Sequence, residues 1–332
     1  MKIRILLALT SVLLWGKLDA QISQDVKDVV DAFPKKINST TSFALLINKN
    51  FKKNDRDKVG GIYYWMATNV VFNTKEHFSD KDKVTYSFRY KTQEEKEAKI
   101  QKVNREIAEQ TFQTKKAVAK EFAFLFEKLC VNSGVECVTI EGTSKSGLKD
   151  IGRKAGRVNH YWNAVKLQGK WQLLDVTWGA GELYEESEYY VRTYSEAYFL
   201  IEPSLFYLNH YPKKGEWLFL NKTREDFGLI PLFYKPYLHS NLQLINEEGV
   251  ITSSEKNTLK VEFSKRDTES SQSVSMFSYA FERGETKKAL MPTYKDGIIQ
   301  MQISIKAIKS DYLTIYGDNR PLTSFKIKMS SY

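Results

Sequence analysis

The sequence predicts an α+β protein with two folded parts, and three patterns along the chain support this. From residue 23 to about residue 130, apolar residues recur at helical spacing. After Gly134 the pattern changes to the alternation that is typical of strands. From about Tyr234 onward only short strand-like runs remain, which indicates a small β-sandwich. We therefore expect a mixed domain over 21–233 and an all-β domain over 234–332.

The composition is that of a globular protein without a disulfide or metal framework. Hydrophobic residues make up 42% of the 332 residues, which is enough for a packed core. The two cysteines, Cys130 and Cys137, cannot form a disulfide-rich scaffold, and four histidines leave little room for a His-rich metal site. No phosphate-binding glycine loop or zinc motif is recognisable, so we expect neither a metal nor a cofactor.

The first 20 residues have the layout of a secretory signal peptide. Lys2 and Arg4 precede an apolar run over residues 5–15, and Ala20 offers a small residue for cleavage. The alternatives are an N-terminal anchor and a buried helix. No later segment is long and apolar enough to cross a membrane. The pattern therefore predicts export to the periplasm, the cell surface or the medium.

The basic charge does not by itself indicate a nucleic-acid partner. The formal net charge is +10, of which Lys2, Arg4, Lys17 and Asp19 supply +2, leaving +8 after cleavage. Lysines and glutamates alternate over residues 94–99, as on a solvated helix face. No basic block with interleaved aromatic residues occurs, and export argues against nucleic acid. Weak attraction to an anionic surface stays open as an alternative.

The expected elements follow from periodicity, caps and turn residues. The helices are Ser23–Phe33, Ser42–Phe51, one capped by Asp55, one from Thr92 to Gln110, and Lys115–Cys130 capped by Thr114. The mixed domain should contain strands at Asn69–Phe72, Val84–Tyr90, Cys137–Glu141, Asn159–Leu167 and Trp171–Trp178. The all-β domain should contain Leu242–Asn246, Thr258–Phe263, Ser273–Phe281, Gly297–Ile305, Tyr312–Tyr316 and Ser324–Met329.

One predicted hairpin brings together residues that can carry chemistry. If Leu167 opposes Lys170 across the Gln168-Gly169 turn, His160 and Asp175 are diagonal neighbours on one face. Such diagonals lie roughly 7–8 Å apart at the backbone, within reach of long side chains. A carboxylate there can orient an imidazole and stabilise its charged form. The alternative is a His–Asp pair that only ties the two strands together.

The sequence of this hairpin resembles the transglutaminase-like superfamily. In that family the two corresponding strands read His-x-Trp-Asn-x-Val and Trp-x-Leu-x-Asp-x-Thr-Trp-Gly. Both patterns stand almost complete in residues 160–165 and 171–179. Residues 62–70, 135–142 and 198–217 also resemble segments of the subgroup that includes kyphoscoliosis peptidase. The resemblance spans residues 25–230. It implies a papain-like cysteine-protease core with an antiparallel sheet, and a Cys–His–Asp triad for acyl transfer or peptide hydrolysis.

The resemblance places an alanine where the family has its nucleophilic cysteine. The family reads Val-Cys-x-Gly-Tyr-Ala-x-Leu-Phe at the start of a helix, where a thiolate is favoured. Here Ala119 takes the cysteine position and Glu121 replaces the glycine. His160 and Asp175 would then be a dyad without a nucleophile.

Other residues could fill the gap or serve the ligand. Cys130 lies roughly 16 Å further along the helix, and Cys137 begins the next strand; both are expected to be buried, although a disulfide between them stays open. Ser144 or Ser146 could approach His160 from its preceding loop. Trp162 and Trp178 are candidates for a ligand-binding groove, although aromatic residues on such strands are usually core.

The leading hypothesis is an exported pseudoenzyme that binds a protein or peptide, or a cell-envelope polymer. It leaves the oligomeric state open. A second hypothesis is an active peptidase or acyltransferase of the same fold with a different nucleophile. A third is a surface adhesion module that acts through the C-terminal sandwich.

Overall fold

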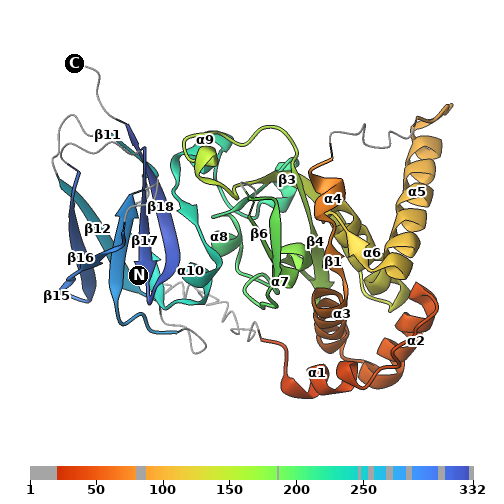
Figure 1. Ribbon diagram of the computed structural model, residues 1–332. Helices are drawn as coiled ribbons and strands as arrows, with labels where there is room; N and C mark the ends of the chain where they lie inside the picture. The colour runs from red at the N-terminus through yellow and green to blue at the C-terminus, as the bar shows by residue number, and fades with distance from the viewer. Residues whose placement is uncertain are drawn as a thin grey trace, which may run out of the picture.

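The structure is a computed structural model that describes residues 21–79, 87–184, 187–245, 248–252, 258–266, 272–281, 286–305 and 311–328. The predicted signal peptide, residues 1–20, lies outside these residues. Figure 1 shows two bodies: helices packed on a small sheet, and a body made of strands. We call residues 21–231 the mixed part and residues 232–328 the strand-rich part.

Three helices open the mixed part, each capped by a polar side chain as their sequences require. The helices are α1 (Gln24–Asp31), α2 (Thr40–Phe51) and α3 (Asp55–Asn69). Their caps are Ser23, Ser39 and Asn54, so Asp55, the predicted cap of the third helix, is instead its first residue. Helix α3 is enclosed by its neighbours: Ile62, Tyr63 and Met66 have no exposed surface.

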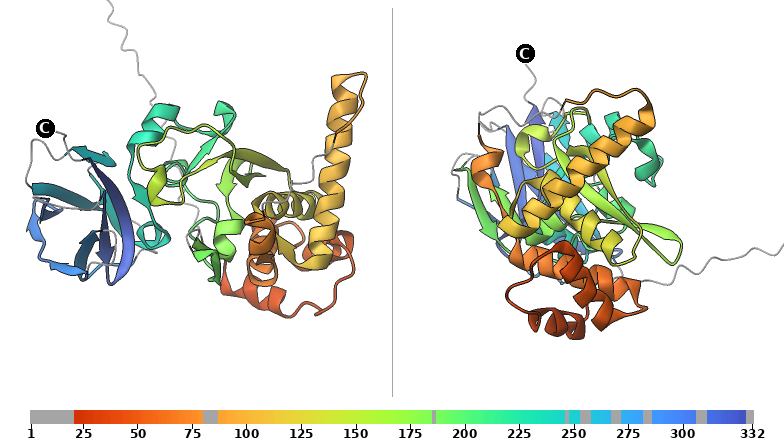
Figure 2. Two further views of the ribbon diagram at one scale, coloured as in Figure 1. Left: turned by 45° about the horizontal axis from the view of Figure 1, so that its top comes forward. Right: turned by 90° about the vertical axis from the view of Figure 1, so that its right-hand side faces the viewer.

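A long charged helix, α5 (Gln93–Thr114), projects from the mixed part (Figure 2). The predicted capping threonine is confirmed, since the Thr92 side chain accepts a hydrogen bond from the backbone nitrogen of Glu95. Between α3 and α5 the chain forms β1 (Val71–Phe72) and α4 (Thr74–His77). The strand predicted at Val84–Tyr90 is not observed over 87–90, and residues 84–86 lie outside the described residues.

The helix predicted at Lys115–Cys130 begins later than expected, and this is a correction. Thr114 is the last residue of α5, and Lys115 ends that helix in a left-handed conformation with φ of 57°. Lys116 and Ala117 then form β2 (Lys116–Ala117), which pairs in parallel with β1. Helix α6 (Ala119–Asn132) starts only after this pairing, with Val118 as its N-cap. The helical periodicity predicted a start at Lys115, but the pairing of β2 with β1 holds residues 116–117 as a strand. The helix therefore begins only at Ala119.

The central sheet of the mixed part is antiparallel, in the order β5-β4-β3-β8. Its strands are β3 (Cys137–Ser144), β4 (His160–Leu167), β5 (Lys170–Leu174) and β8 (His210–Pro212). Helix α6 is fastened to this sheet by Asn163, whose Nδ2 donates to the carbonyl of Ala123 at 3.0 Å and of Val138 at 3.3 Å. The first helical turn of α6 therefore has a fixed place relative to β4.

The predicted hairpin register is confirmed from Leu167↔Lys170 to Asn163↔Leu174. The second strand, however, ends at Leu174 and not at Trp178 as predicted. Asp175 turns the chain into α7 (Val176–Ala180), and its carboxylate caps that helix by accepting from the Trp178 backbone nitrogen at 3.1 Å. An aspartate is a strong N-cap, which explains why the strand pattern stops there.

Short elements connect the sheet to the strand-rich part. They are η1 (Leu148–Asp150), β6 (Gly181–Tyr184), β7 (Tyr189–Arg192), α8 (Pro203–Phe206), η3 (Gly215–Trp217), α9 (Arg224–Leu229) and α10 (Lys235–His239). Strand β9 (Leu232–Phe233) ends one residue before the predicted domain boundary and pairs with β18.

The strand-rich part consists of two sheets that share one apolar core. One sheet has the order β10-β12-β16-β15: β10 (Leu242–Leu244), β12 (Thr258–Lys265), β16 (Ile298–Ser304) and β15 (Thr293–Lys295). The other has the order β11-β18-β17-β13-β14: β11 (Val250–Thr252), β18 (Arg320–Lys328), β17 (Tyr312–Gly317), β13 (Phe277–Phe281) and β14 (Lys288–Leu290). The pairing is antiparallel except for β11 with β18. Alternate side chains such as Val261, Phe263 and Ile315 are fully buried, as the two-residue pattern predicted.

Among the described residues, no helix combines the length and the apolar character that crossing a bilayer requires.

Candidate active site

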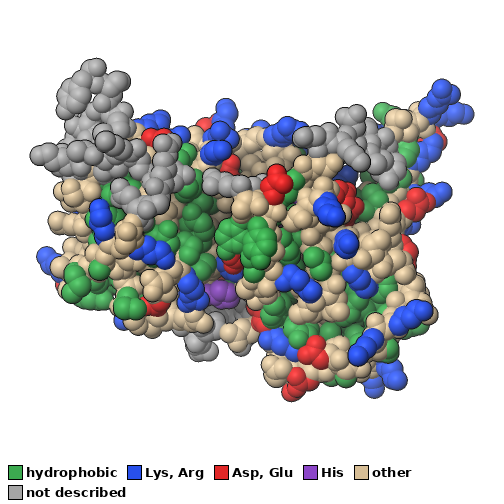
Figure 3. Space-filling view, in the orientation of Figure 1, with side chains coloured by type: hydrophobic (Ala, Val, Ile, Leu, Met, Phe, Trp, Pro, Cys, Tyr) green, Lys and Arg blue, Asp and Glu red, His purple; other side chains and the backbone are tan. Residues whose placement is uncertain are grey.

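The main cavity of the molecule has a volume of about 1660 Å³ and is lined by both parts of the chain. Its walls come from α4, the first turn of α6, the start of β4, α7, β6, the loop around Ser144, and the beginning of β18. Figure 3 shows a hollow between the two bodies. His160, Trp178 and Ala119, which the sequence singled out, all line this cavity.

The predicted contact between His160 and Asp175 is present. His160 is the first residue of β4, and its Nε2 lies 2.6 Å from Oδ2 of Asp175. Asp175 is fully buried and His160 is 5% exposed. The contact does not arise from strand pairing, because the ladder stops at Asn163↔Leu174. It arises because Asp175, as the cap of α7, turns its carboxylate under the imidazole.

A second imidazole binds the same carboxylate oxygen. His210, the first residue of β8, has its Nε2 3.0 Å from Oδ2 of Asp175. Its ring is buried and stacks on Phe206 with centroids 4.0 Å apart. Burial lowers the pKa of His210, and the hydrogen bond that its ring donates to Asp175 offsets only part of that effect. His210 is therefore the neutral partner, donating its Nε2–H to the carboxylate.

The two imidazoles keep Asp175 ionised. Burial alone would raise the pKa of this carboxyl group, but the charge of His160 and hydrogen bonds from both histidines outweigh it. The pKa of Asp175 therefore lies well below its usual range. Because Asp175 holds Nε2 of His160, the other ring nitrogen, Nδ1, is the one left for a group in the cavity.

A buried tyrosine supports this arrangement from behind. Tyr63 of α3 donates to the carbonyl of Ser195 at 3.0 Å and lies 3.4 Å from the carbonyl of Asp175. Gly179 of α7 sits against the Tyr63 hydroxyl, where any Cβ would collide with it. The Trp-Gly pair of the hairpin motif thus has a steric reason: the glycine leaves room for the tyrosine that holds the α7 N-terminus.

Ala119 is the first residue of α6 and lines the same cavity as His160. Two residues further on, Glu121 folds back over the helix end, and its Oε2 accepts a hydrogen bond from the Val118 backbone nitrogen at 2.9 Å. Burial raises the pKa of Glu121, while the hydrogen bond from Val118 lowers it in part. A carboxylate therefore already occupies the positive end of this helix.

The two tryptophans have different places. Trp178 lines the cavity, with its ring centroid 5.5 Å from that of His160 and 4.6 Å from that of His210. Trp162 is only 1% exposed and packs in the core against Ile140 and Phe206. The structure therefore places Trp162 in the core and not in the expected groove, because the rings of His160, His210 and Phe206 pack against it.

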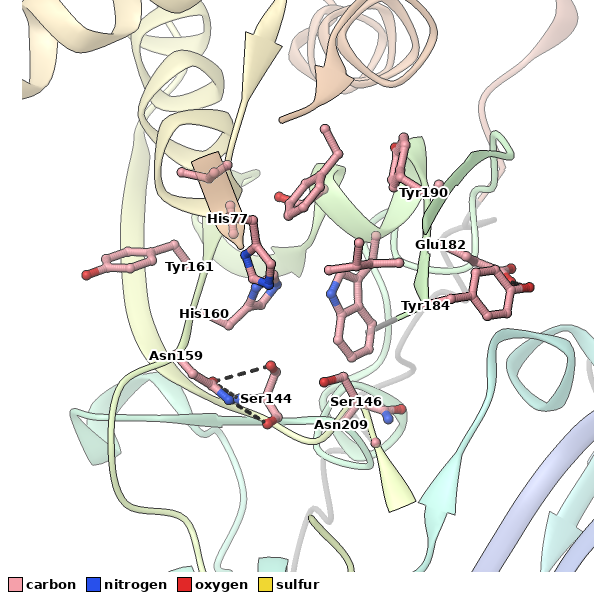
Figure 4. Close-up of a pocket in the computed structure, with 18 of the residues that line it drawn as sticks. His77, Ser144, Ser146, Asn159, His160, Tyr161, Glu182, Tyr184, Tyr190 and Asn209 are labelled. Carbon is pink, nitrogen blue, oxygen red and sulfur yellow. Dashed lines mark hydrogen bonds between the residues drawn. The ribbon is translucent and has the colours of Figure 1, made fainter. Parts of the chain in front are cut away.

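The loop serines lie in the cavity wall, as Figure 4 shows for Ser144 and Ser146. The Ser144 hydroxyl is 3.3 Å from Oδ1 of Asn159, an acceptor that also binds the Ser144 backbone nitrogen at 2.7 Å. The Ser144 hydroxyl is thus hydrogen-bonded to Asn159. Cys130 and Cys137 are free and buried in the core.

In the part of the chain that the structure describes, one group has the makings of a metal site: His160, Asp175 and His210, whose donor atoms lie within 4.8 Å of one another. Hydrogen bonds of 2.6 and 3.0 Å already join these atoms, so the N–H protons occupy the space that a metal ion would need. The three residues thus do not fit a metal while these bonds persist. His210 was not predicted as a site residue, although it lies in the segment 198–217 that resembles the family.

Comparison with known proteins identifies the segment that carries this site. Residues 46–176 match the model of the transglutaminase-like superfamily. Kyphoscoliosis peptidase of Mus musculus is 40% identical over 108 residues, which is 32% of this chain and 16% of that protein. Hillarin of Drosophila melanogaster is 32% identical over 138 residues, 36% of this chain and 17% of that protein. The chain thus spans about a sixth of the length of these relatives.

Among solved structures, a cysteine protease-like protein from Cytophaga hutchinsonii matches 47% of this chain and 43% of its own, with 18% identity and a TM-score of 0.27.

Proposed function

On the premise that this chain carries a domain of the transglutaminase-like superfamily, we propose that it is an exported, catalytically inactive member that binds a peptide in its cleft. The observation that carries the proposal is Ala119. It stands at the N-terminus of α6, in the cavity that contains His160, and the sequence resemblance assigns the family's cysteine to this position. A methyl group has no lone pair to attack a carbonyl, so the dyad has nothing to activate.

The N-terminus of α6 also does not favour the thiolate form that a cysteine nucleophile would need. The partial positive charge of a helix N-terminus lowers the pKa of a thiol, but here the Glu121 carboxylate already binds that end. The other features of the site are present: the buried pair of His160 and Asp175, a wide cavity, and Trp178 in the cavity wall. We infer that the cleft is retained for binding, and a peptide is the ligand that a peptidase-like or amide-transfer cleft accommodates.

The test is to restore the nucleophile. We expect purified 21–332 to show no hydrolysis or amide transfer, and no labelling by a thiol-directed electrophile under native conditions. Ala119→Cys, alone or with Glu121→Gly, should be labelled at residue 119, and the labelling rate should fall when His160→Ala is added. Lys120→Cys is the matched control, since it places an exposed thiol on the next residue of the same helix.

Three results would overturn the proposal. Turnover by the native protein that is abolished in His160→Ala would show an active enzyme. An adduct mapped to Ser144 or another cavity hydroxyl would identify its nucleophile, which is the second hypothesis. The adhesion module would be favoured if the isolated strand-rich part retained binding and if the cleft-blocking Ala119→Trp substitution left binding by the full chain unchanged.

Export has its own test. We propose cleavage after Ala20, so the protein recovered outside the cytoplasm should have an N-terminus at Gln21 by intact mass. A recovered chain that retains residues 1–20 would contradict this.

A further inference from the structure

The strand-rich part forms one wall of the cleft. Arg320 and Pro321, at the start of β18, line the same cavity as His160 and Ala119. The connecting residues 232–236 line it as well. In the space-filling view the hollow runs between the two bodies, so a ligand that fills it contacts both (Figure 3). The C-terminal part can therefore select the ligand.

The charges around the cavity are unevenly distributed. Near α4 and α6, Lys75 and Lys120 are balanced by Glu76 and Glu121. Toward the strand-rich part and the loop before β4, four basic side chains face a single acidic one. These are Lys145, Arg157, Lys235 and Arg320 against Glu182. Burial lowers the pKa of Lys145 to about 7, but the two arginines and Lys235 still outnumber Glu182, so this side of the cavity carries an excess of positive charge.

Two of the four basic groups are already bound. The Lys145 ammonium is buried and donates to the carbonyls of Phe227 at 2.7 Å and Ile230 at 2.8 Å. Lys235 forms an ion pair with Glu182, with Nζ and Oε1 3.2 Å apart. These contacts fix both lysines in the wall, where neither is the main point of attachment for a ligand.

The two arginines remain exposed to the cleft. Arg320 donates one Nη2 hydrogen bond to the Gln272 side chain at 3.0 Å, which leaves most of its five N–H donors for other acceptors. Arg157 is exposed beside Asn159 and His160. A guanidinium group binds a carboxylate through two parallel hydrogen bonds, a geometry that lysine cannot match.

We propose that the ligand is an acidic peptide, whose glutamate or aspartate side chains are bound by Arg320 on the strand-rich side of the cleft and by Arg157 in the loop before β4. The proposal rests on the function proposed above and specifies its ligand. Charge complementarity of this kind discriminates against basic peptides, because a like charge in the cleft costs binding free energy.

The experiment uses residues 21–332 and three fluorescent peptides of equal length, each with a central glutamine flanked by glutamate, glutamine or lysine residues. Binding is followed by anisotropy at low and high salt. We expect the acidic peptide to bind about tenfold or more tightly than the neutral one, and this advantage to shrink at high salt because the charges are screened. In Arg157→Gln/Arg320→Gln the advantage should disappear. Lys49→Gln/Lys295→Gln, which removes two exposed charges outside the cavity, should retain it.

The outcomes separate the two proposals. If all three peptides bind equally and Ala119→Trp abolishes binding, peptide binding in the cleft stands and the acidic preference is refuted. If the double arginine variant keeps the full preference, the assignment to these two residues is refuted. If no peptide binds at all, both the acidic preference and the proposed peptide-binding function fail.

Discussion

His210 and Asp175 are joined by a 3.0 Å contact between Nε2 and Oδ2, and this oxygen also receives the imidazole of His160 at 2.6 Å. The other carboxylate oxygen accepts from the backbone nitrogen of Trp178 at 3.1 Å. Asp175 is therefore held from three directions inside the core. A buried carboxylate of this kind is stable only while its hydrogen-bond donors remain in place.

Replacing His210 should destabilise the fold by removing one donor from a buried charge. His210→Phe keeps a flat ring to stack on Phe206 but removes the Nε2–H. Because hydrogen bonds to charged groups contribute about 1.5–3 kcal/mol, we expect the free energy of unfolding in urea to fall by that amount. In an Asp175→Asn background the same substitution should cost clearly less, since the charge is gone. An equal loss in both backgrounds would assign the effect to packing.

The site should make stability depend on acid pH in two steps. The folded pKa of His210 is lowered by burial, so the unfolded chain binds the extra proton first and stability falls as pH drops below about 6.5. The folded pKa of Asp175 is also lowered, so its contribution is complete above its ordinary value of 3.8 and is lost below it. Melting temperatures between pH 2 and pH 8 should show both falls, the first below about pH 6.5 and the second below pH 3.8. His210→Phe should remove the first step only, and a pH profile unchanged by it would contradict the assignment.

Glu121 should control the acidity of a thiol placed at residue 119. In Ala119→Cys the nearby carboxylate disfavours a thiolate, whereas in Ala119→Cys/Glu121→Gly the helix N-terminus is free to favour it. We expect the pH at which iodoacetamide labelling is half-maximal to be lower in the double variant. Because Glu121 also caps α6, its removal should cost about 0.5–2 kcal/mol of stability. Identical labelling profiles in two folded variants would argue against this placement of the helix end.

The native cysteines should be unreactive in the folded protein. Burial raises the pKa of Cys137, and contact with Cys130 raises it further. Neither thiol should react with a water-soluble disulfide reagent until the protein is unfolded, when two thiols should be counted. A count of zero after unfolding without reductant would instead demonstrate the Cys130–Cys137 disulfide that the sequence left open.

Much of the fold follows from local patterns. The helix caps at Ser23 and Thr92 and the hairpin register from Leu167↔Lys170 were predictable, because they depend on neighbours within a few residues or across one tight turn. The start of α6 was not, because Lys116 and Ala117 pair with a strand more than forty residues earlier. A local helical pattern cannot reveal such a partner.

The sequence by itself determined the hairpin register next to His160 and that an alanine stands at residue 119, whereas the contact of His160 with Asp175 depends on the turn of the chain into α7. Only the tertiary structure decided that His210 shares the Asp175 carboxylate, that Trp162 turns into the core, and that the strand-rich part closes one side of the cleft. The physical reason is the range of each interaction. Periodicity and turn chemistry act along the chain, whereas the burial of a charge and the shape of a cavity depend on every element that packs around them.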